Sequence, residues 1–123
     1  MTLFDSSVLI AHLRGASQAT ELLAAVTSDE RLASVMARVE LEGGMRSGER
    51  VQVASLFSVI RLLPVTDAIA RRAAEHLRRH RRSHSGIDLV DYLVAATAEL
   101  HNAELATLNV RHFPMFKGLR PPW

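Results

Sequence analysis

Residues 2–10 read Thr-Leu-Phe-Asp-Ser-Ser-Val-Leu-Ile, and the fold class can be inferred outward from this segment. Its short apolar run ends at Asp5, which predicts a buried strand at about residues 2–5 that carries a charge at its end. A helical segment is expected to follow at about 6–14. In open α/β sheets, ligands bind in the crevice beyond the carboxyl ends of the strands. Asp5 is therefore a candidate site residue on its position alone.

The rest of the chain repeats this alternation of short apolar runs and helical patterns. Such alternation predicts an α/β fold with a mostly parallel sheet of four to five strands, covered by helices on both faces. A loop is expected at 81–86 and a proline-rich tail, with one short helical turn, at 113–123. Further strands are expected at 32–35, 62–65 and 104–108, and further helices at 17–27, 36–46, 52–60, 67–80 and 87–101.

Composition narrows the class of protein. A chain of 123 residues with 48% hydrophobic content is expected to form one domain over residues 1–123. The absence of cysteine excludes disulfides, zinc-thiolate sites and cysteine nucleophiles. No basic leader and no run of about 18 apolar residues is present. We therefore expect a cytoplasmic protein with no membrane partner.

The net charge is only +2, yet fourteen of the fifteen cationic residues are arginine. Arginine suits bidentate phosphate contacts, although a genome rich in arginine codons would give the same bias. The cations gather in one segment, where a phosphate-binding face and an ordinary solvated helix face are both open interpretations. The clustered residues are Arg71, Arg72, Arg78, Arg79, Arg81 and Arg82, with His76, His80 and His84 among them.

Four of the thirteen acidic residues do not fit an ordinary surface position. Asp5 ends a strand, Glu40 follows the second strand, and Asp88 and Asp91 lie three residues apart, on one face of a helix. Asp91 continues the stripe of small residues expected to meet the sheet, where a carboxylate is costly unless it is paired or metal-bound. An N-terminal charge that stabilises the helix dipole accounts for Asp88. For Asp91 the alternative is a salt bridge to an arginine.

A metal site is the functional interpretation of these acids. If Asp5, Glu40 and Asp91 converge beyond the strand ends, they supply hard oxygen ligands of the kind that Mg²⁺ or Mn²⁺ prefers. A metal held in this way can activate water and offset the charge on a phosphate during an in-line displacement. The implied chemistry is metal-dependent phosphodiester hydrolysis.

An ordered set of motifs resembles a known family. The segments are FDSSVLI at 4–10, VELEGG at 39–44, DYLVAATA at 91–98 and LATLNVRHF at 105–113. In this order and spacing they resemble the PIN-domain ribonucleases, and specifically the VapC toxins of bacterial type II toxin–antitoxin pairs. Each motif alone is weak, but the resemblance covers the whole chain.

The resemblance implies a three-layer α/β/α domain and an Mg²⁺- or Mn²⁺-dependent endoribonuclease. It makes Asp5, Glu40 and Asp91 the catalytic and metal-binding residues, with Asp88 as a further candidate ligand. The implied partners are an RNA substrate, a cognate VapB-type antitoxin and a second copy of the chain in a homodimer. The residues implied as supports of the site are Ser7, Thr107 and Asn109.

One position departs from the family pattern. Many members carry a fourth acid beside the phenylalanine of the last motif, but here His112 holds that place and no acid follows Glu104. Asp88 or Glu42 could compensate, or the site could hold one metal. His112 itself could contact a phosphate or play a structural part.

Positive residues around the acids are expected to hold the RNA backbone, since carboxylates alone repel it. A protein that keeps the fold but is catalytically impaired, and acts as an RNA-binding or interaction module, is the alternative hypothesis. A weaker third is a small-molecule phosphohydrolase with Asp5 as nucleophile. The candidate RNA contacts are Arg14, Arg46, Arg78, Arg79, Arg111 and His112.

Overall fold

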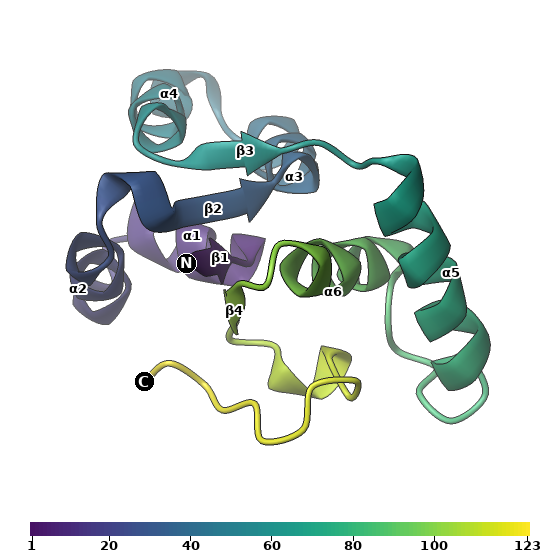
Figure 1. Cartoon of the computed structure of the whole chain (residues 1–123). Helices are drawn as coiled ribbons and strands as arrows, with labels where there is room; N and C mark the ends of the chain where they lie inside the picture. The colour runs from purple at the N-terminus through teal and green to yellow at the C-terminus, as the bar shows by residue number, and fades with distance from the viewer.

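The computed structural model describes residues 1–123, and its centre is a parallel sheet of four strands. The strands lie in the order β3-β2-β1-β4, so the first strand of the chain is in the interior of the sheet (Figure 1). All pairings are parallel, and therefore the carboxyl ends of the strands share one edge. The strands are β1 (Thr2–Phe4), β2 (Arg31–Ser34), β3 (Arg61–Leu63) and β4 (Glu104–Ala106).

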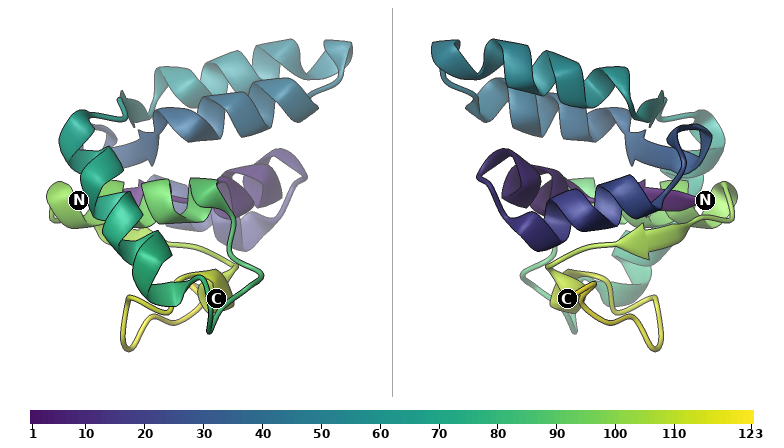
Figure 2. Two further views of the ribbon diagram at one scale, coloured as in Figure 1. Left: turned by 90° about the vertical axis from the view of Figure 1, so that its right-hand side faces the viewer. Right: turned by 90° about the vertical axis from the view of Figure 1, so that its left-hand side faces the viewer.

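Six α-helices connect and cover these strands. Figure 2 shows α3 and α4 lying side by side, with α1 and α2 as a separate pair. Three single-turn 3₁₀ segments, η1 (Ser28–Glu30), η2 (Ser47–Glu49) and η3 (Val110–His112), join the elements. The helices are α1 (Ser6–Leu13), α2 (Ser17–Ala25), α3 (Val35–Gly44), α4 (Arg50–Ser58), α5 (Asp67–His80) and α6 (Leu89–Leu100).

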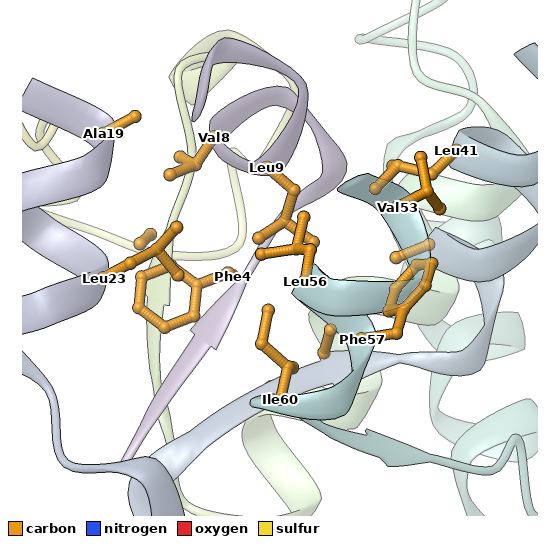
Figure 3. Close-up of a cluster of buried hydrophobic side chains, with 13 residues drawn as sticks. Phe4, Val8, Leu9, Ala19, Leu23, Leu41, Val53, Leu56, Phe57 and Ile60 are labelled. Atoms are coloured by element: carbon orange, nitrogen blue, oxygen red, sulfur yellow. The ribbon is translucent and has the colours of Figure 1, made fainter. Parts of the chain in front are cut away.

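One face of the sheet is covered by the first four helices. Phe4 of β1 lies beside Ala106 of β4 in register, and both point to this face. Figure 3 shows Phe4 among side chains from α1, α2 and α4, including Leu9, Leu23 and Leu56. Burial of these apolar side chains stabilises the layer by roughly 25 cal/mol for each Å² removed from water.

The opposite face packs on α6, and α5 in turn packs on α6. Leu3 lies beside Leu32 in register, and both contact the cluster that contains Val94, Ala95 and Ala98. The small side chains let α6 lie close to the sheet. The arrangement of helices, sheet and helices confirms the expected α/β/α layers, with four strands in the sheet.

Several element boundaries differ from the sequence-based expectation, for local reasons. Helix α3 begins at Val35 rather than at 36, because the hydroxyl of Ser34 caps it by accepting from the Met36 N–H at 3.1 Å. Strand β4 ends at Ala106 rather than at 108. The single helical turn expected within 113–123 lies earlier, in η3.

None of the helices is at once long enough and apolar enough to cross a bilayer.

Candidate active site

Asp5 leaves the sheet at the carboxyl end of β1 and is almost fully buried, with 4% of its surface exposed. Its Oδ2 accepts two hydrogen bonds, from the Ser7 hydroxyl at 2.7 Å and from the Thr107 hydroxyl at 2.8 Å. Its backbone N–H donates to the carbonyl oxygen of Ala106 at 2.9 Å. The ends of β1 and β4 are thus joined at this carboxylate, and neither hydroxyl donates to Oδ1 of Asp5.

The two hydroxyls are themselves oriented by backbone groups. The Leu108 N–H donates to Ser7 Oγ at 3.0 Å, and the Asn109 N–H donates to Thr107 Oγ1 at 3.0 Å. A hydroxyl that accepts from an N–H directs its own proton elsewhere, here to Asp5. Ser7 and Thr107, which the family resemblance implies as supports of the site, thus both donate to Asp5. Asn109 contributes to this network through its backbone N–H.

Asp88 is the N-cap of α6, and its backbone carbonyl oxygen accepts from the Asp91 N–H at 3.1 Å. The Asp88 N–H donates to Asp91 Oδ2 at 3.2 Å. Asp88 is exposed, whereas the Asp91 side chain is 14% exposed and directed inward. Asp88 is thus at the N-terminus of α6, as its interpretation as a charge that stabilises the helix dipole requires. No arginine pairs with Asp91; the side chain that contacts it is His112, with Nδ1 3.2 Å from Oδ2.

Glu40 lies on α3, one and a half turns beyond β2. Although the residue is exposed overall, partial burial of its carboxyl raises its pKa, and the charges of Asp5, Asp91 and Asp88 raise it further. A hydrogen bond with the Ser6 side chain opposes this shift. Sequence reasoning passed over Ser6, whose only signal is its position directly after Asp5.

Burial also raises the pKa of Asp91. The backbone hydrogen bond from Asp88 and the charge of His112 act against this effect, and the negative charges of Asp5 and Asp88 add to it. The negative charges of Asp5, Asp88 and Asp91 thus oppose ionisation of Glu40, and those of Asp5 and Asp88 oppose ionisation of Asp91. The convergence of Asp5, Glu40 and Asp91 on one metal ion stays a prediction.

The carboxylates do not form a closed metal cage: no three His, Asp or Glu side chains are grouped closely enough for direct ligation of one ion. Mg²⁺ does not require such a cage, because it keeps several waters and is bound through one or two carboxylates. The donor set is entirely oxygen, and none of the four acids pairs with Lys or Arg. The residues present thus fit a hydrated hard divalent ion.

A cleft of about 380 Å³ is lined in part by Glu40 and lies between α1, α3, η2 and α4. Arg14 and Arg46 line this cleft together with Glu40. Arg111 and His112 line a second hollow of about 300 Å³ at η3, which also contains Asn109. Arg78 and Arg79 lie on the last turn of α5. The predicted RNA contacts therefore lie in these two hollows and at the end of α5.

Glu42, which was considered as a replacement for the fourth acid, forms an exposed i,i+4 ion pair with Arg38. It is not among the charges that shift the pKa of Glu40 or Asp91, whereas Asp88 is. Of the two compensating acids, the geometry favours Asp88.

Comparison with known proteins assigns the chain to a family. The family model described as "PIN domain" matches residues 2–116. The chain belongs to the PIN-domain family. It is 53% identical over 124 residues to ribonuclease VapC10 of Mycobacterium tuberculosis, covering 100% of this chain and 93% of that protein. It is 46% identical over 125 residues to ribonuclease VapC19 of the same organism, covering both chains completely. The resemblance to VapC proteins is thereby confirmed.

Solved structures show the same PIN-domain fold at low sequence identity. A toxin–antitoxin complex from Klebsiella pneumoniae matches with a TM-score of 0.85 and 24% identity, covering 100% of this chain and 98% of that one. DNA-bound VapBC from Salmonella typhimurium matches with a TM-score of 0.81 and 20% identity, over 98% and 95% of the two chains. These likenesses confirm the three-layer fold.

Proposed function

We propose that this PIN-domain protein is the toxin of a toxin–antitoxin pair and that it cleaves RNA with the help of a divalent metal ion, Mg²⁺ or Mn²⁺. The observation that carries the metal site is the buried Asp5 carboxylate. One of its oxygens is held by two oriented hydroxyls, and the negative charge has no Lys or Arg partner. VapC relatives named ribonucleases support the reaction class.

The metal requirement follows from the charge of the site. Mutual repulsion and burial oppose ionisation of Glu40 and Asp91, and so a bound cation is favourable when both are charged. A divalent metal supplies activation of water for attack on phosphorus and offsets the charge that develops on the phosphate. Asp5, Glu40 and Asp91 are the residues that would hold it, one or two of them directly and the others through its bound waters, with Asp88 as a further candidate ligand.

The chain's own residues fix the geometry around that centre. Ser7 and Thr107 hold the Asp5 carboxylate, while the Asp88 N–H and His112 hold Asp91. Each carboxylate is oriented through its Oδ2. Preorganisation of this kind lowers the cost of assembling the reactive geometry. Arg14 and Arg46 in the cleft beside Glu40 would contact phosphates next to the scissile bond.

A cognate VapB-type antitoxin is the proposed protein partner. The support is that solved proteins of this fold include toxin–antitoxin complexes, among them those from Klebsiella pneumoniae and Salmonella typhimurium. We further propose that residues 1–123 act as one domain, because all four strands contribute to one sheet.

Cleavage of labelled RNA by the purified protein tests the enzymatic proposal. We expect cleavage with Mg²⁺ or Mn²⁺, none with EDTA, and none from the Asp5→Asn or Asp91→Asn variant. Glu42→Gln is the matched control, because Glu42 lies on the same helix as Glu40 but pairs outward with Arg38. Equal cleavage by Asp91→Asn and Glu42→Gln would contradict the assigned site.

A catalytically impaired RNA-binding module is the second candidate, and His112 in the place of a fourth acid is what favours it. It predicts RNA binding without cleavage in either metal, unaffected by Asp5→Asn. Cleavage that depends on Asp5 excludes it.

A further inference from the structure

A run of unpaired arginines marks the end of α5. Residues 78–84 read Arg-Arg-His-Arg-Arg-Ser-His, and no acidic residue occurs between Glu75 and Asp88. The four arginines are exposed and form no ion pair or side-chain hydrogen bond. We call Arg78, Arg79, Arg81 and Arg82 the α5 basic strip.

Other arginines on the same helix are neutralised. Arg71 pairs with Asp67 at 2.9 Å, and Arg72 pairs with both Glu75 and Glu99. The positive charge of α5 is therefore compensated over its first half and uncompensated over its last turn and the following residues. An ordinary solvated helix face mixes both signs of charge.

The helix dipole explains only part of this pattern. Cations near a helix C-terminus are stabilised by the helix dipole, and this effect fades beyond the last turn. It accounts for Arg78 and Arg79 on the last turn of α5. Arg81 and Arg82 lie beyond His80, where the helix ends, and gain little from the dipole.

Two histidines, His80 and His84, lie within and after the α5 basic strip, and the pKa of His80 reflects the positive charge around it. The rings of His80 and His84 lie edge to face with centroids 5.4 Å apart. Partial burial lowers the pKa of His80, and the charges of His84, His76 and Arg79 lower it further. A bound polyanion would relieve this crowding of positive charge.

The strip is close in sequence to the candidate active site. Only three residues separate His84 from Asp88, the N-cap of α6 beside Asp91. The acids repel a polyanion, and so a substrate that reaches them needs compensating cations next to the site. We propose that the α5 basic strip binds the phosphate backbone of the RNA substrate and directs it to the carboxylates. This inference rests on the proposed ribonuclease function for the identity of the polyanion.

Salt-dependent binding of a fluorescent 20-nucleotide RNA in EDTA tests the strip without cleavage. The strip variant is Arg79→Gln/Arg81→Gln/Arg82→Gln. The control, Arg61→Gln/Lys117→Gln/Arg120→Gln, also removes three exposed charges, but around the amino ends of β3 and β4. Each phosphate contact contributes about 0.7 to the slope of log K against log salt for single strands.

We expect the strip variant to bind roughly 10- to 100-fold more weakly near 0.1 M salt, with a slope reduced by about 2. The control is expected to stay within about threefold of the unmodified protein. Equal losses in both variants would show a net-charge effect and overturn the proposal. Binding of the strip to phosphatidylserine vesicles in preference to RNA would also overturn it.

The two proposals fail in different ways. If strip-dependent RNA binding occurs but Mg²⁺ and Mn²⁺ give no cleavage, the strip is supported and the ribonuclease function is lost. If RNA is cleaved but the strip variant binds and cleaves it as the unmodified protein does, the strip proposal alone is wrong.

Discussion

The Nδ1 atom of His112 lies 3.2 Å from Oδ2 of Asp91, the same oxygen that accepts the Asp88 backbone N–H. Asp5 is likewise held through one oxygen, because its Oδ2 accepts hydrogen bonds from both the Ser7 and the Thr107 hydroxyls. In each carboxylate one oxygen is bound by the protein. The contact ties η3 to α6 and gives the residue at the place of the fourth acid a defined partner.

His112→Ala is expected to weaken Mn²⁺ binding about 10- to 100-fold, the usual loss when a group that orients a ligand is removed. Asp91 would keep only its backbone donor. Isothermal titration calorimetry with Mn²⁺ measures the change directly, and His112→Asn, which can retain a donor, should recover part of the affinity. Arg111→Ala on the same turn is the control. An unchanged Mn²⁺ affinity in His112→Ala would show that His112 does not position Asp91.

Thr107→Val is expected to reduce both Mn²⁺ affinity and RNA cleavage about 10- to 100-fold, because it removes one of two donors to Asp5 while keeping the side-chain shape. Thr107→Ser retains the hydroxyl and should behave nearly as the unmodified protein does. The same calorimetry and cleavage assays compare the two variants. If both lose activity equally, the methyl group and not the hydroxyl bond matters.

Much of this site was predictable, because its main features are local. Asp5 directly follows an apolar strand, and Asp88 and Asp91 lie three residues apart at the start of α6. Parallel strands bring their carboxyl ends together, so the meeting of Asp5 and Thr107 follows once the alternation of strands and helices is recognised.

Contacts that depend on the path the chain takes after β4 were not predictable from the sequence. The turn through η3 places His112 against Asp91, and the backbone of Asn109 rather than its side chain joins the Thr107 network. No periodicity encodes such a turn. The expected homodimer and cytoplasmic location stay predictions.

Tyr92→Phe is expected to leave the protein equally stable or to stabilise it by up to about 1 kcal/mol. The Tyr92 hydroxyl is buried between α5 and α6 and has no hydrogen-bond partner, so its removal relieves a desolvation cost. Urea denaturation measures the change. Thr97→Val is the contrast, because the Thr97 hydroxyl donates to the Leu93 carbonyl at 2.7 Å and its loss should cost about 1 kcal/mol. Clear destabilisation by Tyr92→Phe would reveal a partner for the hydroxyl.

A polar network between α5 and α6 predicts acid sensitivity. Glu99 accepts a hydrogen bond from Arg72 at 3.0 Å and contacts the buried His76. Burial opposes ionisation of Glu99, but the bonds and charges of Arg72 and His76 outweigh it and lower the pKa of Glu99 below its ordinary value of 4.5.

The lowered pKa of Glu99 determines how the stability of the protein changes with pH. A lowered folded-state pKa means that the folded protein binds the proton less readily than the unfolded chain. The stability from Glu99 is therefore complete above about pH 4.5 and is lost as the pH falls through the lower folded-state pKa. Urea denaturation from pH 7 to pH 3 should show Glu99→Gln less stable by about 1 to 2 kcal/mol at neutral pH, with the difference shrinking below pH 4.5. Glu75→Gln, at the exposed side of Arg72, should cost less than about 0.5 kcal/mol. A deficit of Glu99→Gln that stayed constant down to pH 3 would mean that packing, and not the charge of Glu99, stabilises this interface.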